Sequence, residues 1–229
     1  MRLKEWVMLP TDWIRSGGLT ALRWSSGVGS DNTAALMTLL RIAHTADESG
    51  IAKATYDDIG LSTGLSRAKI SGGLTVLQEN KVIARMPLGR STFQIVNFNP
   101  RQGWGKLPAR CLYSGDHIAA FSDFKLRNTA ELNALKIYLL AVAFRDNDTN
   151  LAHLSYDKFQ ELAGIDRARI RPALSVLTYT GLLHTERVAS RINAYAISNA
   201  YRLAGLDSYR HAGTTGRSDI FADLISDMQ

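Results

Sequence analysis

The chain has 229 residues, of which 45% are hydrophobic and 21% are charged, a composition that indicates a buried core and excludes a disordered chain. Its longest apolar run, residues 137–144, is less than half as long as a membrane span requires, which excludes a transmembrane helix. The formal net charge of +6 favours a polyanionic partner, and the single cysteine excludes a disulfide framework and is typical of the reducing cytoplasm.

The first hundred residues predict three helices followed by a strand pair. The apolar residues of "NTAALMTLLRIAHTA", which starts at Asn32, recur with a helical period, and "DESGIAKA" follows as a loop. Thr55 is suited to cap a short helix that ends at Gly64, and Ser66 to cap the next helix. The core positions of that next helix are expected to be Ile70, Gly73, Leu74 and Leu77. Strands at 82–85 and 92–98 are expected to pair across the tip "PLGR".

The second hundred residues repeat the first. Residues 55–77 and 155–177 are identical at nine of 23 positions without a gap. At the same offset of 100, "NTAALMTLLRIAH" aligns with "LNALKIYLLAVAF", and "LPTDWIRSG" aligns with "LPARCLYSG" at an offset of 98. This self-similarity predicts two copies of one unit, residues 1–100 and 101–200, followed by a tail of residues 201–229.

The second copy predicts the same elements with changes of detail. Ser155 and Asp166 take the two cap positions. Pro172 stands where the first copy has Gly72, so the third helix of this copy is expected to be kinked or to begin later. In the tail, residues 219–228 predict a short helix with one apolar and one acidic face.

The stretch "TYDDIGLSTGLSRAKISGGLTVLQENKVI" resembles the winged helix-turn-helix family: a short helix, a Gly-Leu-Ser-Arg turn, a recognition helix and a small apolar strand. The second copy is similar, with Ile165, Asp166 and Arg167 at the turn. The resemblance implies an α+β, mainly α, fold of two tandem winged-helix domains that bind double-stranded DNA as a pseudo-dimer. A weaker likeness in architecture links the chain to plasmid replication initiators.

A DNA-reading helix needs a bare outer face, with donors and cations near its start. With the core positions inward, the outward faces of both third helices are free of carboxylates before Glu79. Arg171 is best placed for bidentate contact with guanine, and Gly72 would let DNA approach a bare backbone, so the two copies are expected to read different sequences. The DNA-binding residues expected on the helices are Arg67, Lys69, Ser71, Gly72 and Thr75, then Arg167, Arg169, Arg171 and Ser175.

The wings predict a second set of DNA contacts. Cations flank both hairpin tips, namely Arg85, Arg90, Arg187 and Arg191. In dimeric helix-turn-helix proteins the two reading helices lie about one DNA turn apart, roughly 34 Å, and the same spacing is expected here. Binding is expected to weaken steeply with salt.

Other chemistry lacks a motif. The histidines are far apart in sequence, and no phosphate-binding loop or nucleophile motif is present, so no metal, cofactor or enzymatic activity is expected. The leading role is a transcriptional regulator in the cytoplasm. A replication initiator of a plasmid or mobile element and a winged-helix scaffold that binds other proteins remain alternatives. For self-association or a protein partner, the expected surface is the apolar face of residues 219–228.

Overall fold

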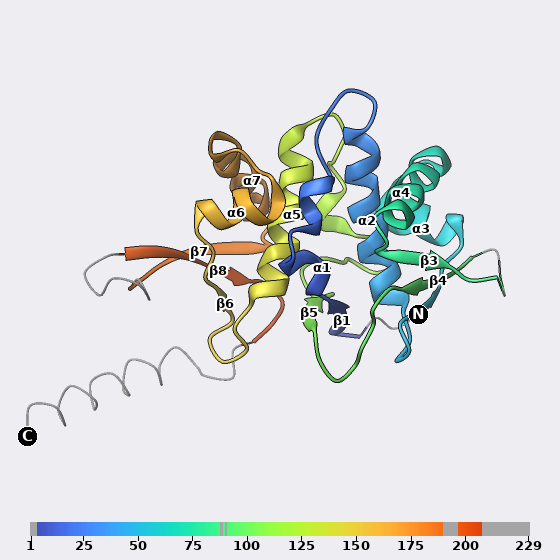
Figure 1. Ribbon diagram of the computed structural model, residues 1–229, viewed down its shortest axis with the longest axis horizontal. Coiled ribbons are helices and arrows are strands. Elements are labelled where there is room, and N and C mark those ends of the chain that lie inside the picture. The colour runs from blue at the N-terminus through green and yellow to red at the C-terminus, as the bar shows by residue number, and fades with distance from the viewer. Residues whose placement is uncertain (1–3, 88, 90, 190–196, 208–229) are drawn as a thin grey trace, which may run out of the picture.

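The computed structural model describes residues 4–87, 89, 91–189 and 197–207. The first half contains β1 (Trp6–Pro10), α1 (Asp12–Arg15), the 3-10 helix η1 (Gly18–Ala21), α2 (Gly29–Thr45), β2 (Ile51–Lys53), α3 (Tyr56–Thr63), α4 (Arg67–Glu79), β3 (Ile83–Arg85) and β4 (Thr92–Ile95). The second half contains β5 (Trp104–Pro108), the 3-10 helix η2 (Ala119–Phe121), α5 (Thr129–Phe144), β6 (Leu151–Ala152), α6 (Tyr156–Ala163), α7 (Arg167–Tyr179), β7 (Leu183–Ala189) and β8 (Ile197–Leu203). Helices α2 and α5 pack against each other at the centre, with α3 and α4 on one side and α6 and α7 on the other (Figure 1).

The fold is α+β and contains two similar units, as the internal repeat predicts. Each unit has a long helix, a short strand, two further helices and an antiparallel strand pair. The strand orders correspond as well, β2-β4-β3 in the first unit and β6-β8-β7 in the second. The prediction of a loop at "DESGIAKA" is wrong, because three of its residues form β2 and pair with residues 92–94 of β4.

The predicted helix ends of the first unit are confirmed. The Thr55 side chain accepts a hydrogen bond from the Asp58 N–H, and the Asp58 carboxylate accepts one from the Thr55 N–H, a capping box. Gly64 ends α3 in the left-handed region at a φ of 71°, a conformation that glycine adopts without steric cost. The Ser66 side chain caps α4 by accepting from the Lys69 N–H. These short polar residues therefore set where α3 and α4 begin.

The second unit departs from the expected helix start. Ser155 caps α6, but Asp166 makes no capping hydrogen bond, and its carboxylate instead lies 3.5 Å from the Arg169 Nε. The later start expected for α7 is also wrong, since the helix begins at Arg167 and Pro172 lies inside it. Pro172 has no N–H to donate to the carbonyl four residues earlier, so α7 lacks one of its internal hydrogen bonds.

Strands β1 and β5 join the two units through a self-complementary register. Met8 faces Lys106, and these two residues correspond to each other in the repeat at the offset of 98. Trp6 faces Pro108. Their counterparts in the repeat, Trp104 and Pro10, face each other in the same way. The rings of Trp6 and Trp104 stack at 6.0 Å with an interplanar angle of 10°. Pairing in which i meets j and j meets i is the pattern of a two-fold symmetric dimer interface, here made within one chain.

The segment after each of these strands crosses to the other unit. After β1, Arg15 donates to the Ala143 carbonyl and its guanidinium lies 4.7 Å from the centroid of the Phe144 ring, and η1 then packs against α6. After β5, Tyr113 meets His44 edge-on at 5.0 Å. Further along, the Ile118 N–H donates to a carbonyl of α3 at 2.7 Å. The exchange is reciprocal, because positions 15 and 113, and positions 44 and 144, correspond in the repeat.

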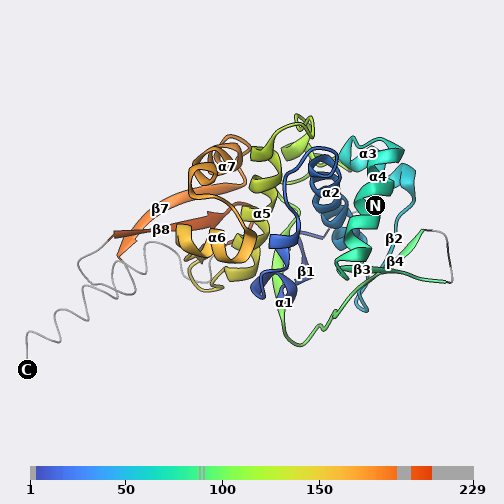
Figure 2. The same ribbon diagram turned by 45° about the horizontal axis from the view of Figure 1, so that its top comes forward.

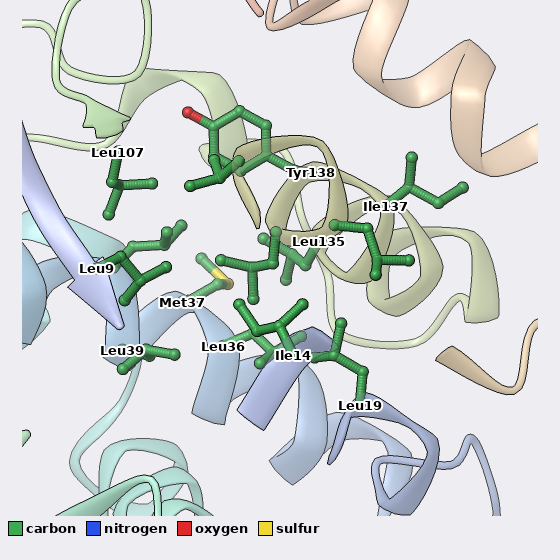
Figure 3. Close-up of a cluster of buried hydrophobic side chains, with 14 of the residues drawn as sticks. Leu9, Ile14, Leu19, Leu36, Met37, Leu39, Leu107, Leu135, Ile137 and Tyr138 are labelled. Atoms are coloured by element: carbon green, nitrogen blue, oxygen red, sulfur yellow. The ribbon is translucent and has the colours of Figure 1, made fainter. Parts of the chain in front are cut away.

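One continuous hydrophobic core spans both units. Helices α2 and α5 are buried on all sides, mostly through apolar residues, although polar side chains such as Arg41 and Lys136 are buried with them. Figure 3 shows Leu36 and Met37 of α2 meeting Leu135 and Tyr138 of α5, with Leu9 of β1 beside them. Strand β8 of the second unit continues to Leu203, three residues beyond the expected end of this unit at residue 200. Among the described helices, none is long and apolar enough to span a membrane.

Candidate nucleic-acid interface

Helices α4 and α7 are presented in the same way by both units. Each follows a glycine in the left-handed region, Gly64 at a φ of 71° and Gly164 at 62°. The next residue, Leu65 or Ile165, is buried and holds the start of the helix to the core. One side of each helix therefore packs on α2 or α5, and the other faces solvent. Figures 1 and 2 show α4 and α7 on opposite flanks of the central pair, at corresponding positions of the two units.

The outward faces consist of small and polar residues, together with one arginine. The exposed positions on these faces include Ala68, Ser71 and Thr75 on α4 and Ala168, Arg171, Pro172 and Ser175 on α7. The hydroxyls of Thr75 and Ser175 donate to carbonyls four residues earlier, at 3.1 and 3.0 Å. Their oxygens keep the capacity to accept, so both faces offer acceptors to a partner that carries donors.

The first arginine of each helix is paired with a carboxylate of the preceding helix. Arg67 lies 2.7 Å from Asp57, and Arg167 lies 2.9 Å from Asp157. These four side chains are 69–82% exposed, and exposed ion pairs contribute about 0–1 kcal/mol. A phosphate can therefore displace the carboxylate at little energetic cost. Both arginines are available to an anionic partner.

The second cation of each helix differs between the units. The Lys69 ammonium donates to Asp31 at 2.8 Å and to Ser30 at 2.6 Å, and its side chain is 37% exposed. Lys69 is thus held against the start of α2. Among the described residues, the only ion pair of Arg169 is the 3.5 Å contact with Asp166, and Arg169 is exposed. Of the two, Arg169 is the freer to follow a partner.

Gly72 does not offer an open approach to the backbone. A Cβ built at this position would lie 2.8 Å from Cγ of Asp31, so the carboxylate occupies the space beside Gly72. The DNA contact expected at Gly72 stays a prediction, with the Asp31 carboxylate beside it. Gly72 makes room for the Asp31 carboxylate that binds Lys69. The counterpart Pro172 is exposed, so the two copies do differ at this position.

Arg171 lies at a hollow that has cationic walls. This hollow, of about 600 Å³, is lined by Arg167 and Arg171 of α7, Tyr156 at the start of α6 and Asn199 of β8, among others. Asp157 lines it too and is paired with Arg167. Among the described residues, Arg171 has no ion-pair partner. An anionic group of the size of a phosphate fits between the helix and the strand pair.

The strand pairs place two of the four expected wing cations on the surface. Arg85 ends β3 and Arg187 lies in β7, and both are exposed. Arg90 and Arg191 lie outside the described residues. Within β7 and β8, Glu186 forms an ion pair with Arg202, whose hydrogen bond lowers the pKa of the glutamate below its usual range. The apolar face expected at residues 219–228 also lies outside the described residues.

Three carboxylates that the sequence does not single out form ion pairs with cations of α4 and α7. Asp57 pairs with Arg67, Asp157 with Arg167 and Asp31 with Lys69, and the position of Asp31 beside α4 has no signal in a single helical wheel. Lys125 and Arg127 were missed as well. They come from the second half of the chain but lie beside Lys69 at the start of α4. No pattern along the sequence indicates this, because the crossing of segments brings the residues together.

No protein-family model matches the chain, and no curated protein sequence matches it either. In the part of the chain that the structure describes, no three His, Cys, Asp or Glu side chains group as a metal site would require. The function is therefore inferred from the geometry of α4 and α7 and from the charges on them.

Proposed function

We propose that this protein binds double-stranded DNA through α4 and α7, each as the reading helix of a winged helix, with the two units acting as a pseudo-dimer. The observation that supports this most is the reciprocal pairing of β1 and β5, around which α4 and α7 take corresponding positions in the two units (Figure 2). Dimeric helix-turn-helix proteins use a two-fold frame of this kind to insert two helices into successive major grooves.

The charges of the exposed side chains fit this partner. Arg67, Arg167, Arg169 and Arg171 are exposed at or near the starts of the two helices, where phosphates and base edges would lie. Arg171 lacks an ion-pair partner in the described chain and stands on the outward face of α7. It is our candidate for bidentate recognition of guanine O6 and N7, the commonest specific contact in the major groove. Because α4 has Ser71 at this position, the two units would read different half-sites.

We assign the leading biological role as a cytoplasmic transcriptional regulator. Mapping of bound sites in the source genome tests this role. A single site that overlaps a promoter supports it, whereas iterated sites within an AT-rich origin would assign the protein to replication initiation instead.

The binding itself is tested by fluorescence anisotropy on duplexes selected from a random library. We expect nanomolar binding whose affinity falls steeply with salt, as release of counterions requires. Arg171→Ala is expected to cost about 1–3 kcal/mol and to relax the preference at one base position. The control is Arg101→Ala, an exposed arginine between β4 and β5, which should leave binding unchanged. Absence of duplex binding at low salt, or capture of only a protein partner, would refute the proposal in favour of a scaffold.

A further inference from the structure

A second cationic hollow lies where the two halves of the chain meet at the start of α4. It has a volume of about 410 Å³, and Ser66 and Lys69 of the first unit line it together with Lys125, Leu126 and Arg127 of the second half. Neither half alone supplies its three cations. Residues 125–127 reach this place because the segment after β5 crosses onto the first unit before α5 begins.

The two cationic side chains from the second half have no ion pair within the described part of the chain. The side chains of Lys125 and Arg127 are exposed, and among the described residues neither has an ion pair or a side-chain hydrogen bond. Lys69 is partly neutralised by Asp31, and the Glu131 carboxylate accepts a hydrogen bond from the Lys125 backbone N–H at 2.9 Å, while the Lys125 and Arg127 side chains have no ion-pair partner among the described residues. Leu126 between them has a φ of 55°, a region that non-glycine residues rarely adopt.

The second unit lacks an equivalent set of charges. At the offset of 100, residues 25–27 are Ser-Ser-Gly where the second half has Lys-Leu-Arg. Ser30, which helps to hold Lys69, corresponds to Ala130. At the positions that correspond to Lys125 and Arg127, the other side of the pseudo-dimer therefore has no cation.

We propose that Lys125 and Arg127, with Lys69, form a phosphate-binding notch that holds the DNA backbone beside the reading helix α4. The inference rests on the proposed function, and it names a contact that the second half of the chain makes for the first unit. Guanidinium and ammonium groups bind phosphate oxygens by charge-assisted hydrogen bonds. The notch opens at the first turn of α4, so a phosphate in it lies next to the groove that this helix would enter. Contacts of this kind set register and affinity without reading sequence.

The test compares the full chain with the double variant Lys125→Ala/Arg127→Ala. We expect the slope of log K against log salt concentration to fall by about 0.9, since the notch holds one phosphate and each phosphate contact contributes about 0.9. Affinity at 0.1 M salt should drop roughly tenfold, with the preferred sequence unchanged. The matched control, Lys4→Ala/Arg101→Ala, removes equal charge at two exposed residues, one just before β1 and one between β4 and β5, neither of which lines the two hollows. It should retain the wild-type slope.

Each alternative outcome has a separate meaning. If the wild-type chain binds duplexes and the double variant keeps the same slope and affinity, the notch is refuted and the proposed function stands. If the wild-type chain binds no duplex, the proposed function itself fails. Inorganic phosphate is titrated against both proteins by calorimetry. Binding of phosphate that the double variant loses, with no change in duplex affinity, would make the hollow a free-anion site and overturn its assignment to DNA. Circular dichroism spectra that match the wild type confirm that the variants are folded.

Discussion

Gly72 and Gly73 are neighbours in α4, but a small residue is needed at the two positions for different reasons. Gly72 leaves room for a carboxylate, whereas Gly73 lies against the backbone of α2. A Cβ at Gly73 would lie 2.8 Å from the Ala35 nitrogen and 2.9 Å from the Ala34 carbonyl carbon. Backbone atoms of a packed helix cannot move aside as the end of a side chain can. Helix α4 can therefore approach α2 this closely only with glycine at position 73.

Gly73→Ala is expected to destabilise the protein by about 1–3 kcal/mol, because overpacking outweighs the gain in helix propensity of about 1 kcal/mol. The matched control is Gly60→Ala in α3. A Cβ there meets only ordinary contacts, at 3.4 Å from the Leu65 carbonyl oxygen and 3.7 Å from Ile70. That variant should be stabilised by about 0.5–1 kcal/mol. Urea unfolding measures both, and equal effects of the two changes would contradict the close approach of α4 to α2.

His44 makes the stability depend on pH. Burial lowers the pKa of His44 from 6.5 to about 4, so between these values the unfolded chain binds more protons than the folded chain. Stability from this residue is complete above pH 6.5 and is lost as the pH falls towards 4, by about 3 kcal/mol in total. In His44→Phe, which places at 44 the residue found at 144, this part of the pH dependence should disappear. Unfolding in urea at pH 7.0 and 4.5 measures it for both proteins, and identical pH dependence would show that His44 does not carry it.

Among the elements, α7 contains the least favourable residue for its structure. Pro172 lies in the sixth position of α7 and is exposed, so no packing requires it. An internal proline costs a helix about 3 kcal/mol relative to alanine, through a lost hydrogen bond and a steric clash.

Pro172→Ala is therefore expected to stabilise the chain by up to about 3 kcal/mol. Thermal unfolding followed by circular dichroism tests this. Ser175→Ala, on the same exposed face, serves as the control and should change stability by less than about 0.5 kcal/mol. A Pro172→Ala variant no more stable than the wild type would mean that α7 begins after the proline, which is one of the two alternatives that the sequence leaves open.

The elements also divide into those that sequence could predict and those that it could not. Thr55, Gly64 and Ser66 act on backbone groups within a few residues, so the bounds of α3 and α4 could be read directly. Strand β2 was missed because its three residues become a strand only by pairing with β4, some forty residues later. The same limit applies to the site. Exposure of Arg171 follows from helical period, whereas the positions of Asp31, Lys125 and Arg127 beside α4 depend on packing between distant segments.

At the scale of the whole molecule, the crossing segments make the two repeats mutually dependent. Each unit packs on residues that the other half supplies, Ile14 and Leu19 on the second and Ile118 on the first. Helices α2 and α5 also bury their facing sides against each other. A chain in which each half completes the other is expected to unfold as one unit, although its sequence reads as two.

Leu135→Ala tests this cooperativity, because Leu135 of α5 is fully buried where the units meet (Figure 3). The cavity is expected to cost about 2–5 kcal/mol. If both units open together, hydrogen exchange through global unfolding should accelerate by the same factor in peptides from α3–α4 and from α6–α7. Ser71→Ala, on the exposed face of α4, is the control and should leave exchange in both regions unchanged. Faster hydrogen exchange in α6–α7 alone would show that the repeats unfold separately. The crossing segments after β1 and β5 would then be only weakly attached to the units on which they pack.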